Sequence, residues 1–447
     1  MRSAHLGTSV ALSLLLSALP GARAEGPPGR PSMPIAQAQP ASQEDTPELA
    51  LGRVRTHIES LLRAPQPALY ARHLRSVLAL SEEEVLRLRF AGARRDEQAK
   101  ELLGYLRTIE AGLSDDGDRS ETYLMEGRRA LTLARLSRSD DTLQYCTVGL
   151  PPRWDPNKAY PLHISLHGGG PRMPLAYVNF TFLPHGADRG QPGPEVIVVG
   201  PWMRGNRPWR EGGESEADIW EAVADVKSFA KLDPDRWYVS GHSMGADDTW
   251  ALVTRTPDLW AAAGMMSGAT YGAPVDLGLT PNISHVPFYI WIGDQDAVPG
   301  RIQSSGEARD ALAAMGNPPK FVLEPGVGHM YRPQDAVAMQ DWLVQHVRRR
   351  PDHFSFVVDT ARHRGVWGIT VPRKYRFSQS VAEPRAALEC WIEGSTVRLQ
   401  AQGAEQLEVD LGPEGLRMSG AVTLLVNGKQ RFSGAVPGKP LTLPLSE

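Results

Sequence analysis

The residues around Ser243 have a pattern that suits a nucleophile. Gly241-His242-Ser243-Met244-Gly245 has the form G-x-S-x-G, and it follows a predicted strand of buried type and precedes a predicted helix. This is the setting of a nucleophile elbow, in which the glycines relieve crowding in a sharp turn and the serine hydroxyl is exposed above a sheet. We predict that Ser243 is a nucleophile and that His242 packs in the turn, because adjacent side chains diverge there.

A serine hydroxyl is a weak nucleophile and needs a base. His329 ends the run Gly326-Val327-Gly328-His329, just after a strand predicted over 321–324. Loops at the carboxyl ends of the strands converge in a doubly wound sheet, and the glycines let the backbone bring the imidazole close to the elbow. We therefore predict that His329 is the base, with His185 and His353 as weaker candidates.

An acid must orient the base, and two carboxylates are available for this. A strand predicted over 288–292 ends in Gly293-Asp294-Gln295-Asp296. Either Asp294 or Asp296 could lie buried against the imidazole, where it would fix the tautomer and stabilise the imidazolium. The other carboxylate would cap the loop.

Acyl transfer also needs hydrogen-bond donors for a developing oxyanion. His167-Gly168-Gly169-Gly170 follows a strand predicted over 162–166, and such a glycine loop offers backbone N–H groups from Gly169 and Gly170 beside that of Met244. The sequence contains no metal-ligand cluster, phosphate loop or dinucleotide fingerprint, so we expect no metal and no cofactor.

Aromatic and basic residues follow the next predicted strand, over residues 201–210. Trp202, Arg204 and Trp209 should reach the rim of the site, where they could line a pocket for an aromatic acid, a sugar or an acidic group. Loop packing and solvated charge are the alternative explanation of the same residues, and the sequence slightly favours it.

The elements that must position these residues divide the chain into three regions. Residues 47–115 have helical periodicity, with a helix start indicated at 81–84, and residues 116–350 alternate apolar strands with helices. That alternation predicts an α/β fold with a doubly wound, mostly parallel sheet. Residues 351–447 read as a small, sandwich-like all-β domain, in which Asn427-Gly428 fits a type I′ hairpin turn.

The N-terminal residues have the features of a targeting signal followed by a linker. In residues 1–24 a short apolar run precedes Ala22-Arg23-Ala24, which predicts a cleaved secretory signal, with an uncleaved anchor as the alternative. Residues 25–46 are rich in Pro and Gly and should form a disordered linker. No later stretch is apolar enough to span a bilayer, so we expect a secreted or periplasmic protein without membrane insertion.

The overall composition is that of an ordinary globular protein. The 447 residues carry a net charge of −3, which gives no global bias towards nucleic acid or anionic lipid, and we expect no nucleic-acid partner. Cys146 and Cys390 are the only cysteines, and they could pair in an oxidising compartment or remain isolated buried thiols. The sequence does not indicate an oligomeric state.

Residues 140–350 resemble secreted α/β-hydrolases of the feruloyl esterase, acetylxylan esterase and polyhydroxybutyrate depolymerase type, which are related to the catalytic domains of prolyl oligopeptidases. The motifs that carry the resemblance are Tyr160-Pro161-Leu162, His167 to Gly170, Asp233-Pro234-Asp235-Arg236-Trp237-Tyr238-Val239, Gly241 to Gly245, Gly293 to Pro299 and Gly328-His329. The resemblance implies that Asp296 is the acid of the triad. The chain departs from the pattern at Ala246, where such proteins commonly have glycine.

The resemblance implies hydrolysis of a carboxylic ester, on a small molecule or linked to a polysaccharide, without naming the acyl group. A serine peptidase of prolyl oligopeptidase type is the alternative on the same triad. It is disfavoured because the N-terminal helical region cannot form the propeller that usually filters peptides. A third reading is a polysaccharide-binding protein, with Trp367 and Trp391 as stacking platforms unless they form the core of the β domain.

Overall fold

The computed structural model describes most of the chain after its first 44 residues. The described residues are 45–115, 131–151, 153–169, 194–205, 213–268, 278–360, 362–372 and 386–445. The chain divides into two units, residues 1–44 and 45–447, and all described residues belong to the second. The predicted signal and nearly all of the predicted linker therefore lie outside the described residues.

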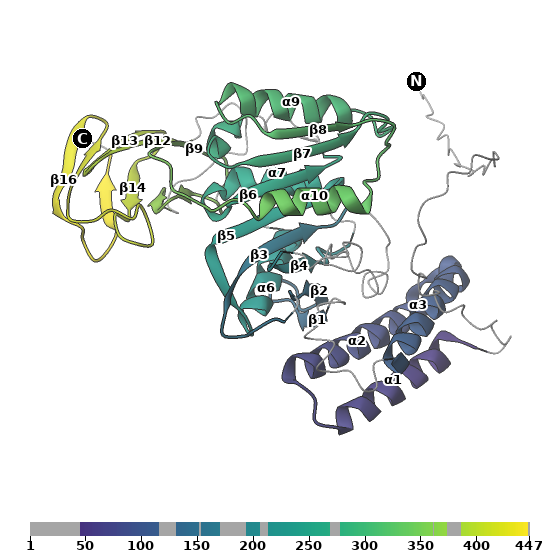
Figure 1. The fold of residues 1–447 in the computed structure, drawn as a ribbon. Coiled ribbons are helices and arrows are strands. Elements are labelled where there is room, and N and C mark those ends of the chain that lie inside the picture. Colours follow the sequence, from purple (N-terminus) through teal and green to yellow (C-terminus); the bar gives the residue numbers. More distant parts are fainter. Residues whose placement is uncertain are drawn as a thin grey trace, which may run out of the picture. The chain divides into compact units, whose positions relative to one another are not determined.

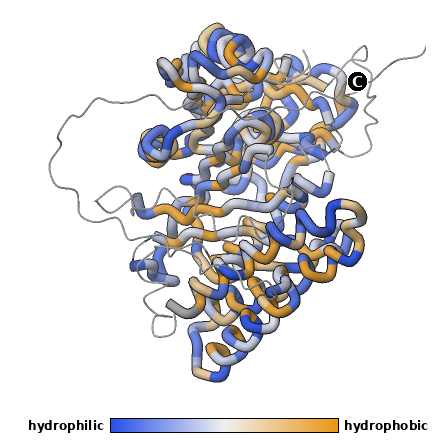
Figure 2. The backbone as a smooth tube through the Cα atoms, turned by 90° about the vertical axis from the view of Figure 1, so that its right-hand side faces the viewer, coloured by the Kyte–Doolittle hydropathy of each residue, from blue (hydrophilic) through white to orange (hydrophobic). Residues whose placement is uncertain are grey.

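Three amphipathic helices open the described chain, and their hydrophobic and hydrophilic residues alternate along the tube in Figure 2. They are α1 (Pro47–Arg63), α2 (Ala68–Arg87) and α3 (Arg95–Asp115), with the 3₁₀ turns η1 (Leu88–Phe90) and η2 (Gly92–Arg94) between the last two. The Thr46 hydroxyl caps α1 by accepting from the Leu49 N–H. The helix start predicted at 81–84 is wrong. Ser81 lies inside α2, where its hydroxyl donates to the Val77 carbonyl instead of capping an end.

An eight-stranded sheet forms the centre of the next region, in the order β1-β2-β4-β3-β5-β6-β7-β8 (Figure 1). Its strands are β1 (Leu131–Leu136), β2 (Leu143–Gly149), β3 (Ala159–Leu166), β4 (Ile197–Pro201), β5 (Lys231–His242), β6 (Ala262–Met266), β7 (Phe288–Gly293) and β8 (Lys320–Glu324). The pairs β1–β2 and β2–β4 are antiparallel and all later pairs are parallel. This confirms the predicted fold class.

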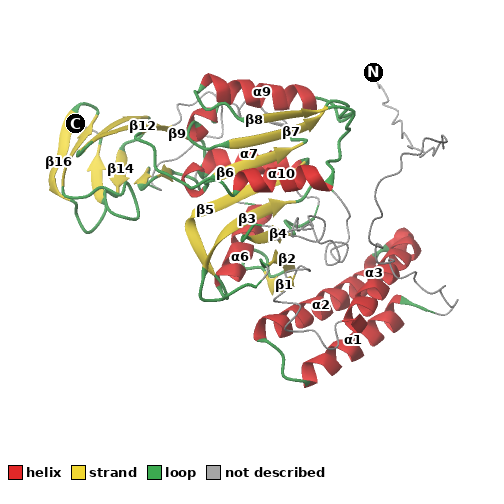
Figure 3. Cartoon of the chain, in the orientation of Figure 1, coloured by secondary structure: helices red, strands yellow, loops and turns green. Residues whose placement is uncertain are grey.

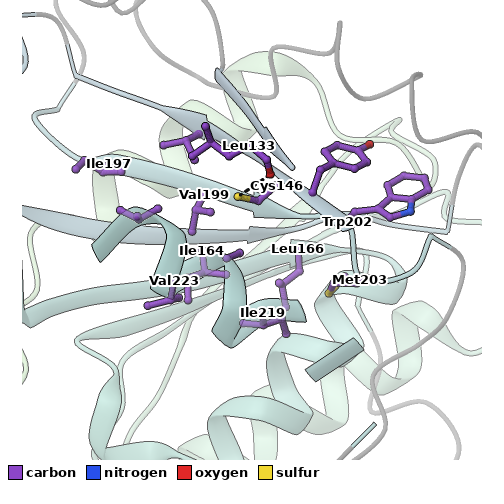
Figure 4. Packing of buried hydrophobic residues seen from close by; sticks show 14 of the residues in the cluster. Leu133, Cys146, Ile164, Leu166, Ile197, Val199, Trp202, Met203, Ile219 and Val223 are labelled. Atoms are coloured by element: carbon purple, nitrogen blue, oxygen red, sulfur yellow. Dashed lines mark hydrogen bonds between the residues drawn. The ribbon is translucent and has the colours of Figure 1, made fainter. Parts of the chain in front are cut away.

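Helices cover both faces of this sheet because successive strand residues point to opposite faces. The helices are α6 (Glu214–Lys227), α7 (Met244–Arg255), α9 (Arg301–Ala314) and α10 (Pro333–Leu343), with 3₁₀ turns η3 (Pro257–Leu259) and η4 (Thr280–Ile283). Val239 belongs to the same core as Trp250 of α7, whereas its neighbour Tyr238 belongs to the core that contains Met339 of α10. Figure 4 shows Ile164 of β3 and the α6 residue Ile219 in the first of these cores.

The C-terminal region contains two further sheets (Figure 3). One has the order β10 (Gly365–Val366), β11 (Ile369–Thr370), β14 (Gln406–Val409), β17 (Leu441–Pro444), and the other β16 (Lys429–Ala435), β15 (Ala421–Val426), β13 (Thr396–Gln402), β12 (Ala386–Glu393), β9 (His353–Val358). Alternate residues of both sheets form one hydrophobic core. Asn427 and Gly428 have φ of 49° and 77° between β15 and β16, as the predicted type I′ turn requires.

The C-terminal sheets are joined to the region of the eight-stranded sheet by specific hydrogen bonds. The Asn282 side chain donates to the Val357 carbonyl over 3.0 Å and accepts from the Val357 N–H over 2.6 Å. Arg255 forms a salt bridge of 2.6 Å with Asp359. The Asn282 amide pairs with both the N–H and the C=O of Val357, which fixes the orientation of that backbone segment. Asn282 therefore anchors β9, the first strand of the C-terminal region.

Cys146 and Cys390 are both buried and free, in separate hydrophobic cores, so they do not pair. Burial raises the pKa of each thiol to about 12. Within the described part of the chain, no helix combines the length and the apolar character needed to cross a membrane.

Candidate active site

Ser243 lies at the sharp junction between β5 and α7. Its φ of 54° and ψ of −116° are values that an L-residue rarely adopts. A Cβ on Gly241 would lie 2.2 Å from the Gly245 carbonyl group, and a Cβ on Gly245 would lie 2.2 Å from the Leu166 carbonyl oxygen. Both glycines are therefore needed for the turn to close against β3.

Three side chains from different loops meet at this turn. His329 Nε2 lies 2.9 Å from Ser243 Oγ, and His329 Nδ1 lies 2.9 Å and 3.0 Å from the two Asp296 oxygens. The Asp296 carboxylate is fully buried and also accepts from the Val298 N–H. A carboxylate at Nδ1 makes that nitrogen the donor and leaves Nε2 to accept the serine proton.

Asp294 has a different position from Asp296. It is exposed, and its carboxylate accepts from the Gly326 N–H over 2.7 Å. It thus ties the loop after β7 to the loop after β8. These loops also pack backbone to backbone, since a Cβ on Gly293 would lie 2.1 Å from the Val327 carbonyl oxygen. The carboxylate that faces the imidazole is that of Asp296.

The backbone of His329 is held by two side chains. Its carbonyl oxygen accepts from His242 Nε2 over 2.8 Å and from Ser267 Oγ over 2.9 Å. Burial lowers the pKa of His242 to about 4, so this imidazole is neutral and can donate from one nitrogen. His242 packs in the elbow, and does not reach the position of a base. Sequence reasoning missed Ser267, for which the only signal was its place at the carboxyl end of β6.

The loop after β3 lies against the elbow, where N–H donors are needed. A Cβ on Gly168 would lie 3.3 Å from the Ser243 Cβ, and Gly169 lines the cavity beside the serine. Met244 is the first residue of α7, and the first N–H groups of a helix have no acceptor within it. Gly170 lies outside the described residues.

A cavity of about 350 Å³ opens beside Ser243 and His329. One wall is an aromatic stack in which Trp202 packs between Tyr145 and His167, with ring centroids 5.5 Å away in each case. His167 Nε2 contacts the Trp202 carbonyl oxygen over 2.8 Å, and this ties the loop after β4 to the loop after β3. Stacking and this hydrogen bond fix the indole as a flat wall of the cavity.

The other residues predicted at the rim do not share that position. Arg204 does not line this cavity. Its guanidinium contacts Asp140 over 3.1 Å together with the hydroxyls of Ser137 and Ser139. Its side chain is only 5% exposed, and one terminal nitrogen, Nη2, makes all three of these contacts. Trp209 lies outside the described residues. Across the residues that the structure describes, no cluster of His, Cys, Asp or Glu could hold a metal ion.

No protein-family model and no curated protein matches the sequence. Among solved structures, a thermostable esterase is 19% identical with a TM-score of 0.36, over 50% of this chain and 64% of that chain. A CE1 ferulic acid esterase from Anaeromyces mucronatus is 17% identical with a TM-score of 0.38, over 48% and 90%. S-formylglutathione hydrolase from Staphylococcus aureus is 18% identical with a TM-score of 0.38, over 48% and 96%.

These likenesses are too low to carry an argument about activity. The fold class follows from the chain itself, because a mostly parallel eight-stranded sheet with a serine at a strand–turn–helix elbow is the architecture of the α/β-hydrolase fold.

Proposed function

We propose that the protein is an exported serine hydrolase that cleaves carboxylic esters through an acyl-enzyme intermediate. The observation that supports it most directly is the hydrogen-bonded chain from Ser243 through His329 to the buried Asp296, at the elbow of an α/β-hydrolase sheet. Export rests on the predicted signal in residues 1–24.

In the acylation step, Ser243 Oγ attacks the ester carbonyl carbon while His329 Nε2 takes the hydroxyl proton. Asp296 stabilises the imidazolium that forms. The carbonyl oxygen becomes an oxyanion, which the N–H groups of Met244 and of Gly169 or Gly170 stabilise. The imidazolium then protonates the alcohol oxygen as the ester bond breaks, and the alcohol leaves.

In the deacylation step, water attacks the acyl carbon and His329 takes its proton. The same N–H groups stabilise the second oxyanion, and the carboxylic acid leaves as Ser243 regains its proton. Trp202 provides an apolar wall for one of the two substrate groups. The substrate class is a small-molecule or polysaccharide-linked ester.

The test is hydrolysis of p-nitrophenyl acetate, butyrate and octanoate, methyl ferulate and a peptide p-nitroanilide by wild type and by Ser243→Ala. Ser395→Ala, on an exposed turn, is the matched control. We expect ester turnover that falls at least 10³-fold in Ser243→Ala alone, because removal of the nucleophile leaves only the oxyanion donors and binding. Turnover that survives in Ser243→Ala would overturn the proposal, and anilide cleavage without ester cleavage would favour the peptidase.

A further inference from the structure

The five-stranded sheet of the C-terminal region has one buried and one outward face. Residues such as Phe354 and Cys390 alternate into the core, so their sequence neighbours lie on the opposite face. The strand register places four of these neighbours in one row across the sheet. They are His353 of β9, Trp391 of β12, Arg398 of β13 and Leu425 of β15. Three strand spacings of about 4.8 Å give this row a length of about 14 Å.

The indole of Trp391 is held in a fixed orientation on this face. The His353 ring stacks on it at a centroid distance of 5.1 Å and an interplanar angle of 11°. Glu389 in turn accepts from His353 Nε2 over 3.0 Å. Trp391 is half-buried, whereas Trp367 is only 3% exposed and belongs to the core. Of the two tryptophans considered from the sequence, only Trp391 can therefore serve as a platform.

A hollow of about 450 Å³ lies beside this indole, lined by residues of β12, β13 and β15. In the strand order, β13 and β15 lie on the side of Trp391 away from His353. The hollow thus borders the ring on the side that His353 does not cover. Its lining includes Glu393, Arg398 and Gln400, which are exposed and supply acceptors and donors of planar shape.

The two carboxylates beside Trp391 each contact a side-chain nitrogen. Glu389 lies against His353, and Glu393 forms a salt bridge of 3.3 Å with Arg398. With Arg398 already paired to Glu393, the described residues of this face offer no cluster of free cations for nucleic acid, anionic lipid or an acidic polymer. An aromatic plane beside amide, carboxylate and guanidinium groups instead suits a sugar ring. The C–H face of the sugar can stack on the indole, while its hydroxyls form hydrogen bonds with the polar groups.

We propose that this face binds a neutral polysaccharide chain, with Trp391 as the stacking platform and Arg398 and Gln400 as hydrogen-bonding partners of the hydroxyls. The length of the row allows contacts to more than one sugar unit. This binding goes beyond the proposed ester hydrolysis and does not require Ser243. It would hold the catalytic region near esters that are attached to such a chain.

The test uses the full mature chain with Ser243→Ala, so that no substrate is cleaved during binding. Its retention is measured on microcrystalline cellulose, insoluble xylan and chitin, and on immobilised polygalacturonate as an anionic probe. We expect retention on at least one neutral polysaccharide. Trp391→Ala should weaken that binding about tenfold, the size expected for loss of one stacking contact.

Phe90→Ala is the matched control, because Phe90 is an aromatic residue in the helical region that is 84% exposed. The Phe90→Ala variant should bind as tightly as the Ser243→Ala protein from which it is made. Trp391→Phe keeps a stacking ring and should recover part of the binding, while the exposed Gln400→Ala tests the hollow without removing a ring. Circular dichroism checks that each variant is folded.

Three results would overturn the proposal. They are no retention on any neutral polysaccharide, equal retention of Trp391→Ala and its parent, and retention on polygalacturonate alone. Because binding is measured with Ser243→Ala, a failure of the ester-hydrolase proposal would leave these outcomes unchanged.

Discussion

The loop after β7 and the loop after β4 both leave the carboxyl edge of the sheet, but their polar side chains have different partners. Asp296 is buried against His329 and belongs to the candidate active site. Arg204 does not line the cavity beside Ser243 and pairs with Asp140. A place just after a strand thus brings a residue to the carboxyl edge of the sheet. The partners of its charged group then determine whether its side chain belongs to the candidate active site.

The largest effect should come from the active-site side of this comparison. Asp296→Asn should lower kcat about 10⁴-fold, because the amide cannot hold the required tautomer or stabilise the imidazolium. Asp294→Asn should keep kcat within a few-fold, since an amide oxygen can still accept from the Gly326 N–H. Steady-state kinetics on an aryl ester compare the two variants.

Similar losses in the two variants, or the larger loss in Asp294→Asn, would mean that Asp296 is not the orienting acid. Urea unfolding of both variants separates this from a general loss of folding.

The second largest effect concerns the loop after β4, where a change should alter the free energy of unfolding instead of turnover. Arg204→Met should lower the free energy of unfolding by about 2–3 kcal/mol, because it removes the hydrogen bonds of a nearly buried guanidinium to Asp140 and two hydroxyls. Its kcat/KM should stay within a few-fold of wild type, as Arg204 does not line the cavity. Urea unfolding and ester kinetics measure the two quantities.

Arg236→Met is the matched control, because the exposed Arg236 pairs with Asp233 over 3.7 Å at the surface. It should cost less than about 1 kcal/mol. A large loss of kcat/KM in Arg204→Met with unchanged stability would instead make Arg204 a substrate-binding residue.

The parts of the site that sequence could predict depend on local backbone rules. Only glycine fits at Gly241 and Gly245, so a motif of five residues is enough to predict the elbow. The parallel strands then bring the loops that carry Asp296 and His329 to the same edge of the sheet. The Asn427-Gly428 turn is equally local.

The parts that sequence could not predict depend on contacts between distant segments. Arg204 has Asp140 as a partner from 64 residues away, and Ser267 contacts the His329 carbonyl from 62 residues away. Neither contact has a motif. Ser81 is a further example. A serine followed by three glutamates is typical of a helix N-terminus, but in the folded chain Ser81 is buried and α2 continues past it.

The smallest effect is a pH dependence of stability that arises beside Ser243 and His329. Burial lowers the pKa of His242 to about 4, against an ordinary value of 6.5. Below pH 6.5 the unfolded chain therefore binds a proton that the folded chain does not, and the free energy of unfolding falls as the pH falls. From pH 6.5 to 4.5 the loss due to His242 should be about 2 kcal/mol.

His242→Gln removes this titration while an amide N–H can still donate to the His329 carbonyl. We expect urea unfolding between pH 6.5 and 4.5 to show a shallower pH dependence in this variant, by about 2 kcal/mol across the range. Burial also lowers the pKa of His285, which packs near Trp367, to about 4, and His285→Gln should remove a similar share of the pH dependence. An unchanged pH dependence in His242→Gln would mean that the pKa of His242 in the folded protein is close to its ordinary value of 6.5, so that it becomes charged below that pH. It would then add a positive charge beside the imidazole of His329, instead of the neutral donor that holds the triad loop in place.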